Sequence, residues 1–217
     1  IAVAGAAAVG WWYARDAPPH QGPIVLIAVD DLPPSALAPS TTRRGTPAVD
    51  ALVADSVVFD RAYAHSPLLL PADVSILSGE LPSEHGVRDN GGFTLEPDVR
   101  TMAELLRGRG VETGAAVSSY LLRRDSGIAQ GFSFFDAAFQ PTGVTAPVAG
   151  RPGAATVDAA EQWARTKSGQ RYFLFMQVPA DDAETAVGRI SDLLKQRRLY
   201  DKATLVLVGA RARSAAG

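Results

Sequence analysis

The feature that most constrains the fold is a short apolar run, Ile24 to Val29, that ends in two adjacent aspartates, Asp30 and Asp31. A continuous apolar run that is rich in β-branched residues and is stopped by turn residues is typical of a strand buried on both faces. Such strands occur in parallel sheets, where ligands bind at the carboxyl ends of the strands. Two adjacent carboxylates repel each other, so a strand end that holds both normally needs a cation.

Helical and strand-like patterns alternate along the chain, which predicts an α/β fold with a mostly parallel central sheet flanked by helices. Besides the first, the strand-like segments are 57–63, 115–120, 172–178 and 204–208. Helices are expected to start at Pro47, Asp73, Thr101, Thr156 and Glu184. Thr46 is expected to cap the first of these helices, and Thr101 with Glu104 forms a capping-box pattern. Residues 67–71, PLLLP, are expected to form an extended apolar loop.

The amino-terminal segment, Ile1 to Tyr13, is apolar and carries no charge. It is shorter than the about 20 apolar residues that a spanning helix needs, but the chain starts at Ile rather than Met, so residues upstream are expected to be missing. Trp11, Trp12 and Tyr13 stand where aromatic side chains meet lipid headgroups. We therefore expect the end of a transmembrane anchor in the lipid bilayer. A signal-peptide remnant and a buried soluble helix are the alternatives.

The expected organisation is an anchor at 1–13, a linker at 14–22 and one folded domain at 23–217. The formal net charge is −2 and no block of Lys and Arg occurs, which argues against a nucleic-acid partner. The chain has no cysteine, so thiolate chemistry and disulfides are excluded.

Several sequence blocks occur in order at close spacing: VLIAVDDL, TPAVDALVADSVVFDRAYAHSP, LPADVSILSGELPSEHGVRDNGG and TMAELLRGRGVETGAAVSSYLLRRDSGIAQGFSFFD. Through these blocks the chain resembles the amino-terminal half of a sulfatase, in the alkaline-phosphatase superfamily. The resemblance is close over 23–136 and resumes over 155–208. It implies the sulfatase fold, with the carboxy-terminal subdomain of the family missing from this chain.

The resemblance also implies a site to test. Sulfatases hydrolyse sulfate or phosphate esters with a nucleophile and a divalent cation, which lowers the pKa of the nucleophile and neutralises charge on the transferred group. The paired metal-binding aspartates of the family fall on Asp30 and Asp31. The nucleophile, a cysteine converted to formylglycine, a serine or a threonine, falls on Leu69, which has no nucleophilic atom. The basic residue that would hold the anionic group falls on Asp73, which is itself an anion.

The remaining site positions of the family are also altered. Its second metal-binding run falls on Arg211 and Ala212, where the family has Asp and His or Asn. A family histidine falls on Gln177, and the usual substrate loop beyond it is missing. His85 and Arg88 match the family, although they lie in a segment that also shapes its loop.

Taken together, these replacements predict a catalytically inactive pseudoenzyme without a cofactor. We hypothesise that the guanidinium of Arg211 takes the position of the cation and pairs with Asp30 or Asp31, which would satisfy two crowded carboxylates. A divalent cation such as Ca²⁺ or Mg²⁺, weakly held by Asp30 and Asp31, is the alternative.

The leucine triplet, Ser66 and Trp163 have ordinary structural interpretations. Leu69 and its leucine neighbours are expected to fill the emptied site as core, with an exposed contact surface as the alternative. Ser66 is expected to cap a turn before Pro67 rather than replace the nucleophile. Trp163 is expected to pack within the core.

An inactive hydrolase domain on a membrane anchor needs a role other than turnover. The expected role is an accessory or scaffold subunit on the extracytoplasmic (periplasmic) side of a membrane complex, for example a photosynthetic, respiratory or transport assembly, whose subunits are its partners. Such a subunit should expose an apolar patch. The alternatives are an ester hydrolase with a rearranged metal site at Asp30 and Asp31, and an anion-binding module near His85 and Arg88.

Overall fold

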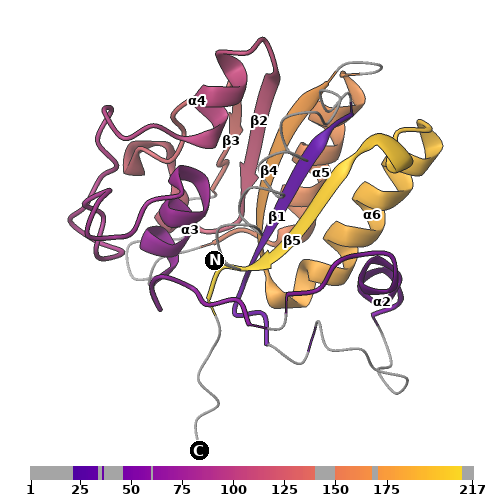
Figure 1. Ribbon diagram of the computed structural model, residues 1–217, viewed down its shortest axis with the longest axis horizontal. Helices are drawn as coiled ribbons and strands as arrows, with labels where there is room; N and C mark the ends of the chain where they lie inside the picture. Colours follow the sequence, from indigo (N-terminus) through magenta and orange to yellow (C-terminus); the bar gives the residue numbers. More distant parts are fainter. Residues whose placement is uncertain are drawn as a thin grey trace, which may run out of the picture.

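The computed structural model describes residues 22–33, 36, 46–59, 61–139, 150–167 and 171–211. Its centre is a sheet in the order β3-β2-β4-β1-β5, in which every neighbouring pair of strands is parallel (Figure 1). The strands are β1 (Ile24–Asp30), β2 (Glu112–Val117), β3 (Phe134–Asp136), β4 (Tyr172–Pro179) and β5 (Thr204–Gly209). The α/β architecture with a parallel sheet is therefore as the sequence predicted.

Helices cover both faces of this sheet. The α-helices are α2 (Pro47–Ala54), α3 (Leu69–Ser78), α4 (Met102–Arg107), α5 (Gly153–Arg165) and α6 (Ala183–Gln196). The 3-10 helices are η2 (Tyr120–Leu122), η3 (Arg124–Ser126), η4 (Ala180–Asp182) and η5 (Tyr200–Lys202). In Figure 1, α5 and α6 lie on one face with α2 beside α6, and α3 and α4 lie on the other face.

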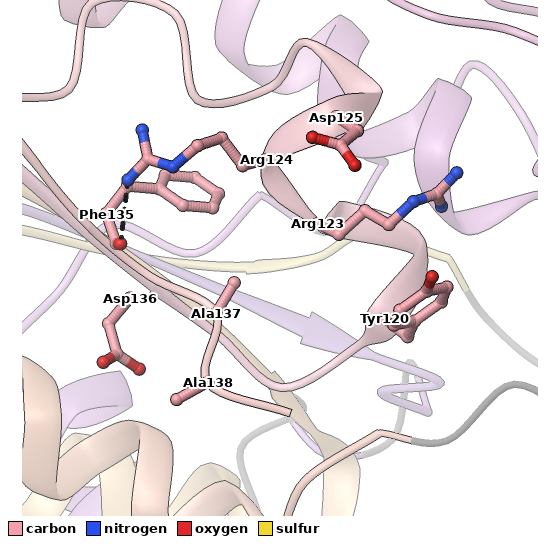
Figure 2. Close-up of a pocket in the computed structure, with 8 residues that line it drawn as sticks. All are labelled: Tyr120, Arg123, Arg124, Asp125, Phe135, Asp136, Ala137 and Ala138. Atoms are coloured by element: carbon pink, nitrogen blue, oxygen red, sulfur yellow. Dashed lines mark hydrogen bonds between the residues drawn. The ribbon is translucent and has the colours of Figure 1, made fainter. Parts of the chain in front are cut away.

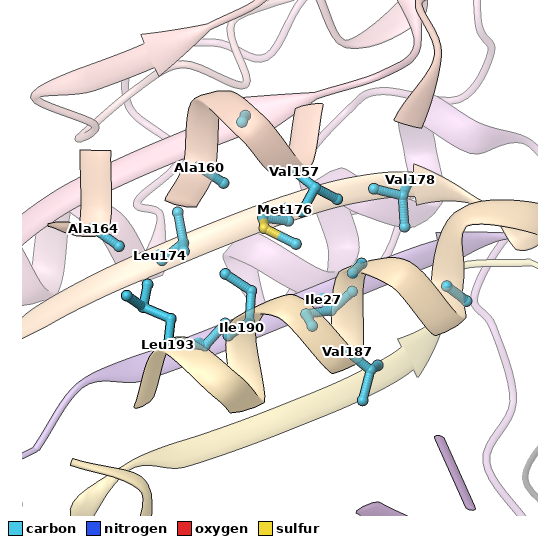
Figure 3. Packing of buried hydrophobic residues seen from close by; sticks show 14 of the residues in the cluster. Ile27, Val157, Ala160, Ala164, Leu174, Met176, Val178, Val187, Ile190 and Leu193 are labelled. Carbon is cyan, nitrogen blue, oxygen red and sulfur yellow. The ribbon is translucent and has the colours of Figure 1, made fainter. Parts of the chain in front are cut away.

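Strand β1 contributes to two separate cores, because successive side chains of a strand point to opposite faces. Val25, Ile27 and Val29 pack with α5 and α6 on one side of the sheet. Figure 3 shows this packing, in which residues of α5 and α6 meet Ile27 and the side chains of β4. Leu26 and Ala28 pack on the other side with α3 and its surroundings. The prediction of a strand buried on both faces is confirmed.

Of the two helix caps predicted from the sequence, one is observed and the other is not. The side chain of Thr101 accepts a hydrogen bond from Glu104 N and the Glu104 carboxylate accepts one from Thr101 N, so the capping box is confirmed. Thr46 precedes α2 but makes no capping hydrogen bond. Instead, the Glu184 carboxylate of α6 accepts hydrogen bonds from Ala48 N at 2.7 Å and Val49 N at 3.0 Å.

The expectation of an extended loop at 67–71 is wrong, because α3 already begins at Leu69. A proline is tolerated within the first turn of a helix, where the backbone N–H groups have no intrahelical partner. Pro71 occupies such a position, and the neighbouring Leu70 N donates to the side-chain oxygen of Asn90 at 3.0 Å. Of the five residues expected to be extended, Leu69, Leu70 and Pro71 therefore form the first turn of a helix.

The strand expected at 57–63 is also not observed. The described residues of this segment lie in no strand, and Val57, Phe59 and Tyr63 are 78–83% exposed. A β-strand needs a neighbouring strand to satisfy its backbone groups, and the sheet of the described residues does not include this segment. The β-prone composition of 57–63 was therefore not enough to form a strand.

The predicted anchor at 1–13 and most of the linker lie outside the described residues. Within the part of the chain that the structure describes, no helix has the length and apolarity to cross a bilayer.

Candidate functional site

The carboxyl end of β1 lies between β4 and β5 in the sheet. Val29 is in register with the last residue of β5, and its carbonyl oxygen accepts a hydrogen bond from Ala210 N at 3.0 Å. The chain that leaves β5 is therefore held against the end of β1, which places Arg211 beside Asp30. Asp31 follows with a left-handed φ of 57°, where the chain turns out of the strand.

Arg211 forms a two-pronged ion pair with Asp30. Its Nε donates to Asp30 Oδ1 at 2.5 Å and its Nη2 donates to Asp30 Oδ2 at 3.1 Å, while Nη2 lies 3.6 Å from Asp31 Oδ2. The hydrogen bond to Asp30 raises the pKa of Arg211 above its ordinary value, and loss of hydration partly opposes this. The pairing that we hypothesised from the sequence is confirmed.

This pair decides whether the site fits a divalent cation. Both oxygens of Asp30 are engaged by the guanidinium, which would also repel a metal ion. Among the described residues, no group of three or more His, Cys, Asp or Glu side chains is placed to hold a metal. The residues present therefore do not fit a catalytic divalent cation while Arg211 stays paired.

Leu69 lies in the first turn of α3 and is 2% exposed. It packs in the core between α3 and the sheet, together with Leu70. The core interpretation of these two leucines is thus confirmed. Ser66 Oγ accepts a hydrogen bond from Leu68 N at 3.1 Å, which is the turn-capping role expected for it.

Asp73, one turn further along α3, is fully buried. Neither of its carboxylate oxygens has a hydrogen-bond partner among the described residues. Burial raises the pKa of Asp73 well above its ordinary value, the nearby Asp30 raises it further, and Arg211 lowers it. The position that the resemblance assigns to an anion-holding residue is occupied by a buried acidic group.

His85 is buried and has a structural environment. Its Nδ1 accepts a hydrogen bond from Val87 N at 3.1 Å, so Nε2 is free to donate to Ser75 Oγ at 3.0 Å. Burial lowers the pKa of His85, which favours the neutral ring. Arg88 is exposed. These contacts do not favour the anion-binding alternative at His85 and Arg88.

Gln177 connects two strand ends. It is 1% exposed, and its side-chain oxygen accepts hydrogen bonds from Ser118 N at 3.0 Å and Ser119 N at 2.9 Å. Both donors lie just beyond β2, so Gln177 fixes the loop after β2 to β4. The remaining candidate residues, Trp11, Trp12, Tyr13 and Ala212, lie outside the described residues.

A surface hollow that was not predicted from the sequence follows β2 and β3 (Figure 2). Its lining includes Arg123 and Arg124, and the adjacent arginines of the segment YLLRRD were the signal that could have indicated it. Trp163 packs as expected, stacked on Phe134 with ring centroids 5.7 Å apart.

No protein-family model and no curated protein matches the chain, but solved structures do. A phosphonate monoester hydrolase of Agrobacterium radiobacter aligns at 15% identity and a TM-score of 0.69 over 88% of this chain and 63% of its own. A Vibrio parahaemolyticus protein of the alkaline phosphatase superfamily aligns at 15% identity and a TM-score of 0.61, covering 91% and 56%.

A 2-O glycosaminoglycan sulfatase aligns at 20% identity and a TM-score of 0.55, covering 79% of this chain and 37% of its own. The chain therefore has the fold of sulfatases and of the alkaline-phosphatase superfamily, and it spans less than two thirds of the length of each of these three structures.

Proposed function

We propose that this chain is a catalytically inactive sulfatase-like protein that acts as an accessory or scaffold subunit of a membrane complex. The observation that carries the proposal of inactivity is the ion pair of Arg211 with Asp30. Asp30 is a position that the resemblance assigns to the catalytic cation. Arginine stays charged at any accessible pH, so this side chain opposes a metal ion permanently.

The residue at the position of the nucleophile supports the same conclusion. Leu69 has no oxygen or sulfur that could attack an ester, and its side chain is packed in the core. Covalent catalysis needs a nucleophile that a base or a metal ion activates. Here the nucleophile and the activating ion are both replaced, by a leucine and an arginine.

Hydrolysis and cation binding test the proposed inactivity. Whole protein is assayed against 4-nitrophenyl sulfate and 4-nitrophenyl phosphate with Ca²⁺ or Mg²⁺, beside the matched variant Asp30→Ala. We expect equal background release of nitrophenol from both proteins, and no thermal stabilisation of the wild type by either ion. Cation-dependent turnover that Asp30→Ala abolishes would overturn the proposed inactivity.

The variant Arg211→Ser tests the mechanism of that inactivity. Without the guanidinium, the carboxylates of Asp30 and Asp31 are left to repel each other. Ca²⁺ should then raise the melting temperature of Arg211→Ser, and the double variant Arg211→Ser, Asp30→Ala should lose this response. Equal responses of all three proteins would mean that Arg211 does not substitute for a cation.

Two features support a scaffold role on the extracytoplasmic side of a membrane. The run Ile1 to Tyr13 has the composition of an anchor end. Between α2 and α3, Val57, Phe59 and Tyr63 expose apolar side chains that a partner subunit could cover. A photosynthetic, respiratory or transport complex would supply such subunits.

Native separation tests the scaffold role. Membranes of cells that produce the protein are extracted in mild detergent, and mass spectrometry identifies what migrates with this chain. We expect migration with a large assembly in a fixed ratio. Migration of the chain alone, under conditions that keep known complexes of the same membrane intact, would contradict the proposal.

A further inference from the structure

The hollow beyond the carboxyl ends of β2 and β3 has a volume of about 470 Å³. It is lined by Tyr120, Arg123, Arg124, Asp125, Phe135, Asp136, Ala137 and Ala138. Figure 2 shows Arg124 and Phe135 on one side of it, Tyr120 and Arg123 on the other, and Ala137 and Ala138 along the lower wall. The hollow thus combines charged groups with an aromatic and apolar surface.

Its two arginines are held by aromatic rings rather than by carboxylates. The guanidinium of Arg124 lies 5.2 Å from the ring centroid of Phe135, and its Nη2 donates to the Phe135 carbonyl oxygen at 3.2 Å. The guanidinium of Arg123 lies 4.9 Å from the ring centroid of Tyr120. Neither arginine has an ion-pair partner in the described part of the chain.

Arg124 therefore keeps donors for a ligand, although its side chain is exposed. A guanidinium carries five N–H donors in a planar fork, and one direct contact to Phe135 leaves most of them available. The ring and the carbonyl of Phe135 orient the side chain, which lowers the entropy that is lost when its guanidinium binds an oxyanion.

Two carboxylates also lie in the hollow, and they differ in their surroundings. Asp136 forms an ion pair with Arg151, whose side chain is 7% exposed, so the charge of Asp136 is compensated by that arginine. Asp125 is exposed and stands between the two arginines in Figure 2. An incoming anion would gain from Arg124 and Arg123, and it would be opposed chiefly by Asp125.

We propose that this hollow binds a small organic monoester of phosphate or sulfate, with the oxyanion against Arg124 and the organic group against Tyr120 and the two alanines. Arg123 supplies a second positive charge beside Tyr120. Its lining includes neither Asp30 nor Arg211, and it needs neither a nucleophile nor a metal ion, so it does not depend on the function proposed above. It binds its ligand without turnover.

Phenyl phosphate is the probe, and binding is followed by calorimetry and by backbone amide shifts in NMR spectra of the whole chain. Inorganic phosphate lacks the apolar part and phenol lacks the charge, so each should bind about tenfold more weakly or not measurably. The affinity for phenyl sulfate, compared with that for phenyl phosphate, shows which of the two oxyanions the hollow prefers. The shifted amides should belong to 120–125 and 135–138, and affinity should fall with added salt.

Four variants locate the site. Arg124→Gln should weaken binding by about tenfold, and Arg123→Gln by about two- to threefold, because Arg123 is oriented by the ring of Tyr120 alone. Asp125→Asn should strengthen binding by about two- to threefold, because it removes the opposing charge. Arg109→Gln is the matched control, since Arg109 is an exposed arginine before β2, at the other end of that strand.

Opposite effects of Arg124→Gln and Asp125→Asn support the site, because general destabilisation would weaken binding in both variants. Three results would overturn it: no saturable binding of either ester, equal effects of Arg109→Gln and Arg124→Gln, or amide shifts confined to other segments. Arg211→Ser should leave phenyl phosphate affinity unchanged, which separates this test from that of the inactive centre.

Discussion

At the scale of single residues, three carboxylates, those of Asp30, Asp31 and Asp73, lie near the guanidinium of Arg211 at the carboxyl end of β1. Arg211 binds Asp30 directly and lies 3.6 Å from an oxygen of Asp31. Asp73 receives none of these hydrogen bonds, although it is fully buried. An unpaired buried polar group costs about 1–3 kcal/mol of stability. We therefore expect Asp73 to lower the stability of the folded state.

Its titration leads to a prediction about pH. Burial raises the pKa of Asp73 above the ordinary value of 3.8, so above that value the unfolded chain releases a proton that the folded chain retains. Folding stability then falls as the pH rises, until the raised pKa of the folded state is passed. Asp73→Asn should abolish this fall of stability with pH, because an amide does not titrate. The variant should be more stable than the wild type by only on the order of 1 kcal/mol at neutral pH, because the buried amide would also lack a hydrogen-bond partner.

Urea unfolding across a pH series measures this effect. Asp98→Asn is the control, because Asp98 is exposed. The prediction fails if wild type and Asp73→Asn lose stability in parallel as the pH rises.

At the scale of elements, two helices are capped by carboxylates from distant parts of the sequence. Glu184 of α6 binds the first N–H groups of α2, and Asp182 of η4 accepts a hydrogen bond from Gly153 N at the start of α5, at 3.1 Å. A carboxylate at a helix N-terminus accepts hydrogen bonds from backbone N–H groups that have no partner within the helix, and its negative charge interacts favourably with the positive end of the helix dipole. These contacts join helices as well as ending them.

Glu184→Ala should therefore destabilise the protein by about 1–2 kcal/mol, the usual cost of losing a cap. The amides of Ala48 and Val49 should exchange hydrogen faster, while those of α4 keep their rates. Glu184→Gln keeps an acceptor and should lose less stability. If Glu184→Ala and wild type unfold at the same urea concentration, the contact does not stabilise α2.

A close approach between β2 and α5 gives a second prediction. A Cβ atom on Gly114 would lie 2.7 Å from ring atoms of Trp163, closer than real contacts allow. Gly114→Ala should therefore cost about 1–3 kcal/mol through overpacking, as measured by thermal or urea unfolding. Gly91→Ala is the control, because nothing lies within 4 Å of its new Cβ. Equal stability of both variants would show that Trp163 can move aside freely.

At the scale of the whole molecule, the described residues bury both faces of the sheet but leave one apolar segment outside. Val57, Phe59 and Tyr63 have the largest exposed fractions of the large apolar side chains described. Single exposed apolar residues are ordinary on a protein surface, and it is large contiguous apolar patches that mark interaction sites.

Phe59→Ser, Tyr63→Ser should leave the free energy of unfolding within about 0.5 kcal/mol of wild type, because exposed side chains contribute little to folding. Binding of a dye that fluoresces on apolar surfaces should fall in this double variant. Leu77→Ser, in a buried position of α3, is the contrasting control and should destabilise strongly. A large stability loss in the double variant would mean that these side chains are buried in solution.

Local sequence patterns predicted some elements of the fold and missed others. Apolar runs predicted β1, β4 and β5, and the Thr101–Glu104 box predicted the start of α4. The short strand β3 was missed, because three half-buried residues give little periodic signal. The segment 57–63 was predicted as a strand from composition, but strand formation depends on a partner that local sequence does not reveal.

By itself, the sequence determined the α/β class and the lack of a nucleophilic atom at Leu69, because both follow from residue type and local spacing. Tertiary structure decided which groups meet: Arg211 reaches Asp30 across 181 positions, and Glu184 caps a helix 135 positions away. It also placed Arg123 and Arg124 around a shared hollow. Local preferences act within a few residues, whereas these contacts exist only after the sheet has brought distant strand ends together.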